Sequence, residues 1–228
     1  MNTRSLLTGL RFVDSFFPSG GYAYSSGLEA AVQGGAVKTA DDLARFVTES
    51  LTTGIGEREA VAAGLAHDAI VSGILEIALK ADQELEAMKL GREVRVASRQ
   101  MGRQVVRLAA EQNDRHPLLE DYVGAVETER TPGHIAVAMG LTLAAAGWSK
   151  PDAIAAFLYQ AAAGSVAAAM KLLPIGQREG QRLLDGWLEI IDRVSRQAAQ
   201  QRVLRSWSPV QEIYAMRHSR LESRLFRS

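Results

Sequence analysis

Apolar residues recur along this chain at intervals of three and four, which is the period of an amphipathic helix. Between residues 82 and 112, for example, Ala97, Met101, Val105 and Leu108 follow one another at steps of four, four and three and share one helix face. No segment sustains the alternation of period two that marks a half-buried strand. The pattern therefore predicts an all-α protein.

Capping signals and turns divide this pattern into about eight to ten predicted helices. Thr39 with Asp42, and Ser26 with Glu29, fit the capping box, in which a hydroxyl and an acidic side chain satisfy the first amide groups of a helix. Thr131, which precedes a proline, is another predicted start. The expected helices cover residues 4–17, 26–33, 39–53, 57–80 (one or two helices), 82–112, 117–126, 131–147, 149–173, 177–200 and a short segment from 208.

We expect residues 1–228 to form a single compact helical domain, because no repeat and no linker rich in Pro, Gly and Ser interrupts them. The end of the chain differs in charge. From Arg196 to Ser228 there are seven arginines and two acidic residues. The sequence predicts a loose basic C-terminal tail, with residues 216–228 ordered by a partner. A frayed terminus is the alternative.

Composition excludes several kinds of chemistry. The 228 residues include no cysteine, which rules out disulfides, thiolate metal sites and cysteine nucleophiles. The 26 basic and 26 acidic residues cancel, so net charge predicts neither a nucleic-acid-binding nor a membrane-surface protein. Hydrophobic residues make up 47% of the chain, as in a folded soluble domain.

One uncharged stretch of 18 residues, Ala153 to Met170, reaches the lower length limit for a membrane span. It is largely alanine and includes Gln160 and Ser165, so its transfer into lipid would be unfavourable. We predict a buried core helix there. The first ten residues lack the apolar run of a signal peptide, and the expected location is cytoplasmic.

The search for catalytic and cofactor motifs gives no candidate. The chain has no Walker A string, no nucleophile elbow and no strand to precede a dinucleotide-binding loop. The four histidines are scattered and do not form a metal-binding motif, which disfavours a standalone metallohydrolase. We therefore predict no catalytic residue, no metal ligand and no cofactor of the chain's own, and a protein that is not an enzyme.

A ridge of arginines is the most informative charge pattern. Arg95, Arg99, Arg103 and Arg107 recur at every fourth position, where like charges repel unless acidic residues of a neighbouring helix compensate them. Three interpretations remain open: a solvated face with intramolecular partners, a docking surface for an acidic partner, or a helical regulator that binds nucleic acid. Aromatic residues that would stack on bases are absent from the ridge, which weakens the last.

Four sequence blocks, in order along the chain, resemble one known family. The first is D-S-F-F-P-S-G-G-Y at 14–22, followed by G-L-E at 27–29. The second runs from Gly133-His134 to Gly140. The third runs from Tyr159 through P-I-G-Q at 174–177 to G-Q-R-L-L at 180–184, and the last is S-R-L-F-R-S at 223–228. Together they are similar to the urease accessory protein UreF family, with Glu222 in place of a more common Tyr.

The resemblance implies an all-α homodimer without catalytic activity of its own. It implies a complex with the accessory protein UreD (also called UreH) and the GTPase UreG, which docks on apo-urease and helps to insert nickel. Within that complex, UreF-like proteins would bridge UreD and UreG and influence GTP hydrolysis. Nickel would be handled by the complex, with no nucleic acid and no membrane among the partners.

The resemblance and the residue chemistry together select candidate partner-binding residues. We expect the basic and apolar residues of the last block to contact UreD. The turn in the first block offers tyrosines and glycines for a partner or dimer surface, because tyrosine provides contact area at low entropy cost. The helix break in the third block would expose two glutamines. The candidates are Arg224, Leu225, Phe226, Arg227, Pro18, Gly20, Gly21, Tyr22, Tyr24, Gln177 and Gln181.

Overall fold

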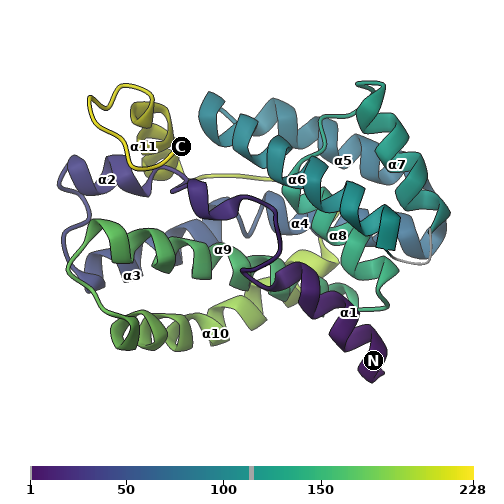
Figure 1. The fold of residues 1–228 in the computed structure, drawn as a ribbon, viewed down its shortest axis with the longest axis horizontal. Coiled ribbons are helices and arrows are strands. Elements are labelled where there is room, and N and C mark those ends of the chain that lie inside the picture. The colour runs from purple at the N-terminus through teal and green to yellow at the C-terminus, as the bar shows by residue number, and fades with distance from the viewer. Residues whose placement is uncertain (1, 113–115) are drawn as a thin grey trace.

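The computed structural model describes residues 2–112 and 116–228, which form eleven α-helices, one short 3-10 helix and one π-helical turn, without a strand (Figure 1). The all-α prediction is confirmed, and the described helices exceed the expected number by one. The elements are α1 Thr3–Val13, η1 Gly21–Ala23, α2 Leu28–Gln33, α3 Ala40–Glu49, η2 Ser50–Gly54, α4 Glu59–Ser72, α5 Leu75–Met88, α6 Arg92–Gln112, α7 Pro117–Glu127, α8 Ile135–Ala145, α9 Lys150–Leu172, α10 Gln177–Gln200 and α11 Pro209–His218.

The core is organised around α8, which packs against α4, α6 and α9. All residues from Ala136 to Leu143 are buried, so this helix has no polar face. Gly140 allows α4 to approach closely, because a Cβ at this position would lie 2.2 Å from the carbonyl oxygen of Ala63. In Figure 1, α5 to α8 gather on one side of the molecule, whereas α2, α3, α10 and α11 gather on the other.

Helix α9 contains the uncharged stretch and is, within residues 2–112 and 116–228, the one helix long and apolar enough to cross a membrane. Its residues Ile154, Phe157 and Leu158 are buried. The helix packs between α4 and α10. These contacts are those of a core helix in a globular fold, as the sequence indicated.

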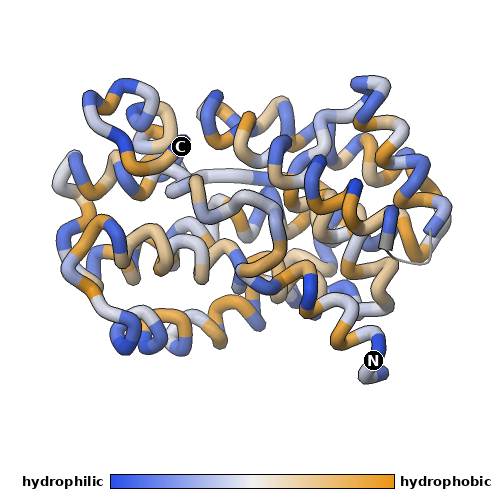
Figure 2. Tube along the Cα trace, viewed as in Figure 1, coloured by the Kyte–Doolittle hydropathy of each residue, from blue (hydrophilic) through white to orange (hydrophobic). Residues whose placement is uncertain are grey.

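Helix α10 is amphipathic, and Figure 2 shows hydrophobic positions on its inner side and hydrophilic ones on its outer side. Leu184, Trp187, Ile191 and Val194 are buried, as their spacing predicts. The same apolar spacing in the sequence also predicts Leu188 on this buried face, and this prediction is wrong, because the side chain is 48% exposed. One step along a helix turns a side chain by about 100°, which carries Leu188 away from the contact made by Trp187.

The helix predicted over residues 82–112 is two helices. α5 ends at Met88 and α6 begins at Arg92, and Lys89 has an extended backbone between them. This break directs the Lys89 ammonium group to the buried carboxylate of Glu59 at the start of α4. The helix therefore ends where its continuation would prevent Lys89 from forming this buried ion pair.

The buried carboxylate of Asp82 joins α5 to α7 and to the start of α8. It accepts hydrogen bonds from the hydroxyls of Tyr122 (2.9 Å) and Thr131 (2.7 Å) and from the backbone amides of Gly133 (2.6 Å) and His134 (2.9 Å). The predicted helix start at Thr131 is therefore wrong: its hydroxyl bonds Asp82, and α8 begins four residues later. Burial raises the pKa of Asp82 above its ordinary value, although the four hydrogen bonds each lower it.

His134 is fully buried beside this junction and is satisfied as a neutral ring. Its Nδ1 lies 3.0 Å from the Ser98 hydroxyl and its Nε2 lies 3.0 Å from a Glu86 carboxylate oxygen. One nitrogen can donate to Glu86 while the other accepts from Ser98. Burial, followed by the charge of Lys89, lowers the pKa of His134 to about 3.

This environment of His134 predicts acid sensitivity. In the unfolded chain a histidine takes up a proton near pH 6.5, whereas folded His134 stays neutral until about pH 3. The unfolded state therefore binds more protons in this window, and the free energy of unfolding should fall by up to about 1.4 kcal/mol per pH unit on acidification. We expect His134→Gln to reduce this slope in urea titrations between pH 6 and 4. Equal slopes in both proteins would contradict the assignment.

Candidate partner-binding surface

The C-terminal tail lies along α2 and the segment that precedes it. The Arg227 amide donates to the Ala23 carbonyl (2.8 Å), and the Ser25 amide donates to the Ser228 carbonyl (2.7 Å). Ser228 and Phe226 are buried, with exposed fractions of 1% and 6%. The prediction of a loose tail is therefore wrong for these last residues, because donors and acceptors of α2 and of the segment before it satisfy the tail backbone.

Glu29 on α2 provides two acceptors for the tail. Its carboxylate oxygens receive the amides of Leu225 (2.7 Å) and Phe226 (3.1 Å). The prediction that Glu29 and Ser26 form a capping box is accordingly wrong. Gly27 is the N-cap of α2, and the Glu29 amide donates to the Ser25 hydroxyl at 3.3 Å. The box predicted at Thr39 and Asp42 is confirmed.

His218, the last residue of α11, links Glu29 to α6. The ring is fully buried, with Nε2 2.9 Å from a Glu29 oxygen and Nδ1 2.7 Å from a Glu93 oxygen. The other oxygen of Glu93 pairs with the guanidinium of Arg224 at 2.9 Å. Polar side chains from α2, α6, α11 and the tail thus meet in one cluster. The sequence gives no local sign that Glu29, Glu93 and His218 form a group, because 189 residues separate the first from the last.

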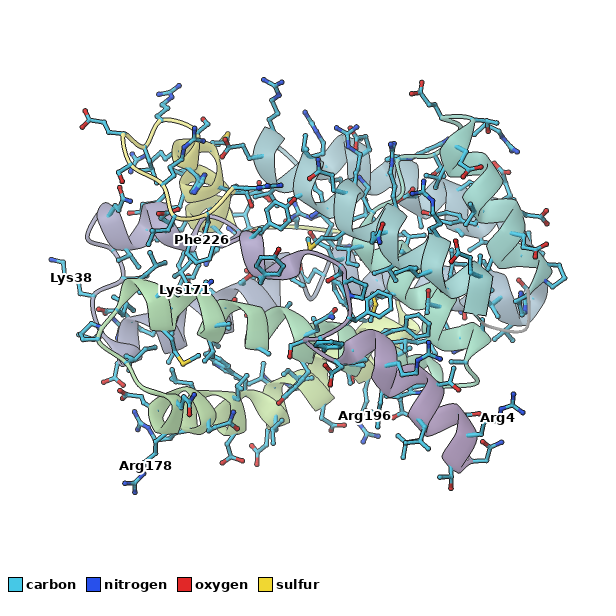
Figure 3. All side chains as sticks on the ribbon, viewed as in Figure 1. Arg4, Lys38, Lys171, Arg178, Arg196 and Phe226 are labelled. Carbon is cyan, nitrogen blue, oxygen red and sulfur yellow. The ribbon has the colours of Figure 1, made fainter. Side chains whose placement is uncertain are left out.

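The four tail candidates have different exposures. Leu225 is 71% exposed and the side chain of Arg224 is 43% exposed, and Arg227 also faces solvent. Phe226 instead packs into the core of its own chain, with the Lys171 ammonium group 5.2 Å from its ring centre (Figure 3). The direct contact predicted for Phe226 is therefore available only if the tail moves, whereas its three neighbours are accessible.

The turn candidates lie next to the tail. Gly20 has φ of +78°, a left-handed conformation that favours glycine, and Gly21 follows it at the start of η1. The Tyr24 hydroxyl donates to Gln100 on α6 at 2.7 Å, which fixes the turn on the body. Tyr22 is 80% exposed, and Pro18 is exposed as well. The structure thus brings the turn and the tail together through Ala23 and Arg227.

The glutamine candidates lie elsewhere. Gln177 and Gln181 are exposed on the first turns of α10. In Figure 3 their neighbour Arg178 projects from the lower margin of the molecule, whereas Phe226 lies higher, beside Lys171. Gln177 and Gln181 therefore belong to a different surface from the tail.

The arginine ridge has intramolecular partners. Glu86 on α5 lies 3.5 Å from Arg95 and 3.4 Å from Arg99, and Arg103 donates to the Pro132 carbonyl at 2.9 Å. Arg107 is exposed. The compensating acidic residue that the ridge requires is thus present, which favours the first of the three interpretations.

Across the part of the chain that the structure describes, no group of three or more His, Cys, Asp or Glu side chains is arranged to hold a metal ion. Most of the candidate residues lie on an ordered tail, which has exposed apolar and cationic side chains, and on an adjoining turn, which exposes Tyr22. This arrangement on an all-helical body is that of a protein-interaction domain.

Comparisons with known proteins show which family the chain resembles. The UreF family model matches residues 37–187. The urease accessory protein UreF of Actinobacillus pleuropneumoniae serotype 5b (strain L20) is 33% identical over 175 residues, which cover 77% of each chain. UreF of Haemophilus influenzae (strain 86-028NP) is 31% identical over 77% of this chain and 74% of its own. UreF of Bacillus sp. (strain TB-90) is 28% identical over 98% of this chain and 99% of its own.

The chain belongs to the UreF family of urease accessory proteins. As a member of this family it is an accessory protein rather than a catalytic enzyme, and its role involves other proteins of urease maturation. The family resemblance inferred from the four sequence blocks is confirmed.

Proposed function

We propose that this protein is a scaffold for urease maturation that bridges UreD and the GTPase UreG, docks with them on apo-urease and assists nickel insertion. In this role it acts in the cytoplasm as a homodimer, holds no cofactor of its own and modulates GTP hydrolysis by UreG. Family membership supports the accessory role. The partner assignments rest on the resemblance and on the surface described above.

The observation that carries the proposal is an exposed leucine on an ordered tail. Leu225 is 71% exposed, although Glu29 fixes its backbone. A preordered apolar side chain between two cations suits a protein partner, because the entropy cost of ordering it has already been met. Helix α11, directly before the tail, adds a second exposed apolar face: Val210, Ile213 and Met216, spaced by three residues, are each more than 40% exposed.

Co-purification with UreD tests this proposal. We expect the full chain to form a stable complex, and a chain that ends at Met216 to lose it. Leu225→Asp should weaken binding by about 30-fold, the effect of removing an interface hot spot worth about 2 kcal/mol.

Leu188→Asp is the matched control, because Leu188 is also exposed but lies on α10. It should leave the affinity for UreD unchanged. Equal binding by the full chain, the shortened chain and Leu225→Asp would show that the tail is not the UreD surface.

A further inference from the structure

Helix α11 and the tail, residues 209–228, are held on the rest of the protein mainly by polar contacts. Of the ten residues of α11, only Ala215 and His218 are buried. The tail after it adds one buried aromatic ring, that of Phe226. The hydrogen bonds and ion pairs that Glu29 and Glu93 make are therefore a large share of the contacts that hold residues 218–228 in place.

The two contacts of the His218 ring bear on where its protons lie. A neutral imidazole has one N–H donor, whereas both ring nitrogens of His218 face carboxylate oxygens, at 2.7 and 2.9 Å. If Glu29 and Glu93 are both ionised, a neutral ring would leave one ring nitrogen facing a carboxylate oxygen with no proton between them. Both contacts are satisfied when the ring is an imidazolium that donates to Glu29 and to Glu93.

With His218 protonated, the cluster is also balanced in charge. Two carboxylates, Glu29 and Glu93, face two cations, His218 and Arg224. Buried charges are stable only when they are paired and hydrogen-bonded. Glu29 is 1% exposed and His218 is fully buried, so removal of either partner would leave the other uncompensated.

We propose that protonated His218, Glu29 and Glu93 form an ionic clamp that fastens residues 219–228 to α2 and α6. The clamp positions Arg224 and Leu225 for a protein partner. The existence of the clamp is independent of the proposed function, whereas its effect on UreD binding rests on that function. His218, Glu29 and Glu93 are thus positioning residues that act on the partner surface through the tail.

Hydrogen exchange of the tail amides in the full-length chain tests the clamp. Glu29→Gln should speed exchange at Leu225 and Phe226 by about tenfold or more, because an amide group in place of the carboxylate loses hydrogen bonds to a charged acceptor. His218→Gln should have the same effect and should increase tryptic cleavage after Arg220. Unchanged exchange in both variants would overturn the proposal.

Glu222→Gln is the matched control. It removes the same charge as Glu29→Gln, from the tail itself, but Glu222 is exposed and outside the cluster. We expect exchange at Leu225 and Phe226 to stay within about twofold of the parent protein, since exposed charges contribute little. A response equal to that of Glu29→Gln would mean that net charge, not the clamp, orders the tail.

Nitrogen-15 NMR of the unmodified protein gives a test that needs no variant. We expect both ring nitrogens of His218 to show the shifts of protonated imidazolium at neutral pH. A ring with a single N–H would overturn the imidazolium assignment, even if the tail were ordered.

Affinity for UreD separates the clamp from the proposed function. If Glu29→Gln releases the tail and weakens UreD binding by about tenfold, both are supported. If the tail is released while UreD binding is unchanged, the clamp stands and the tail is not the UreD surface. If UreD binding falls while the tail stays ordered, the clamp is wrong and Glu29 acts in another way.

Discussion

Replacement of Asp82 by alanine should lower the free energy of unfolding by about 4 kcal/mol or more, the largest effect expected of a single substitution here. The fully buried carboxylate accepts four hydrogen bonds, two from hydroxyls and two from backbone amides. Alanine would leave all four donors without an acceptor. Each buried unsatisfied donor costs about 1–3 kcal/mol, although the costs are not additive.

Urea denaturation followed by circular dichroism measures the Asp82 effect. Asp121→Ala is the control, because Asp121 is exposed on α7 and its loss should change stability by less than about 0.5 kcal/mol. If Asp82→Ala costs no more than this control, the four hydrogen bonds contribute little to stability.

The second large effect is expected from Glu59→Ala, at about 3–5 kcal/mol of unfolding free energy. Burial alone would raise the pKa of Glu59, but the charges of Lys89 and Arg58 outweigh burial and hold the pKa below its ordinary value. Arg58 binds this carboxylate through two nitrogens, each at 3.1 Å. Removal of the carboxylate would leave two nearly buried cations, with Glu212 at 2.7 Å from Arg58 as the remaining acidic partner.

Thermal unfolding of Glu59→Ala beside Glu57→Ala tests this expectation, because Glu57 is exposed only two residues away. Since Glu59 titrates at a lower pH in the folded than in the unfolded chain, its stabilisation is present above about pH 4.3 and fades on further acidification. We therefore expect the two variants to differ most near neutral pH. Similar melting temperatures there would contradict this account of the ion network.

The ion pairs of Glu59 and Arg58 also help to hold the helix that carries part of the candidate surface. Glu212 lies on α11, so its contact with Arg58 fixes the first turn of that helix, while His218 fixes the last. Gly27 completes the attachment, because a Cβ there would lie 2.7 Å from the Ala215 amide nitrogen. Ionic contacts at both ends and a close backbone approach in the middle hold α11 while its outer apolar face remains free.

Local patterns were sufficient for much of the fold. The period of apolar residues predicted the buried face of α10, and the capping box at Thr39 and Asp42 placed the start of α3. These signals succeed because the interacting groups are within a few residues of one another. Leu188 shows the limit of such reasoning, since an apolar residue at the edge of a helix face can point to solvent.

Long-range polar contacts were beyond local patterns. Thr131 carries the signal of a helix start, but its hydroxyl binds Asp82, 49 residues earlier. Glu29 carries the signal of a capping box, but its carboxylate binds the tail, 196 residues later. In each case a buried charge determines the local geometry, and the sequence does not show which distant group it meets.

The central claim, that this protein serves urease maturation, is tested most directly in cells. A host that expresses urease with its other accessory proteins but lacks its own UreF would receive this chain. We expect urease to gain activity and bound nickel, and the chain that ends at Met216 to restore little of either. The decisive control uses cells in which the full chain is folded and abundant, together with the UreD and UreG of the organism from which this chain comes. Urease that stays inactive and free of nickel in those cells would contradict the account.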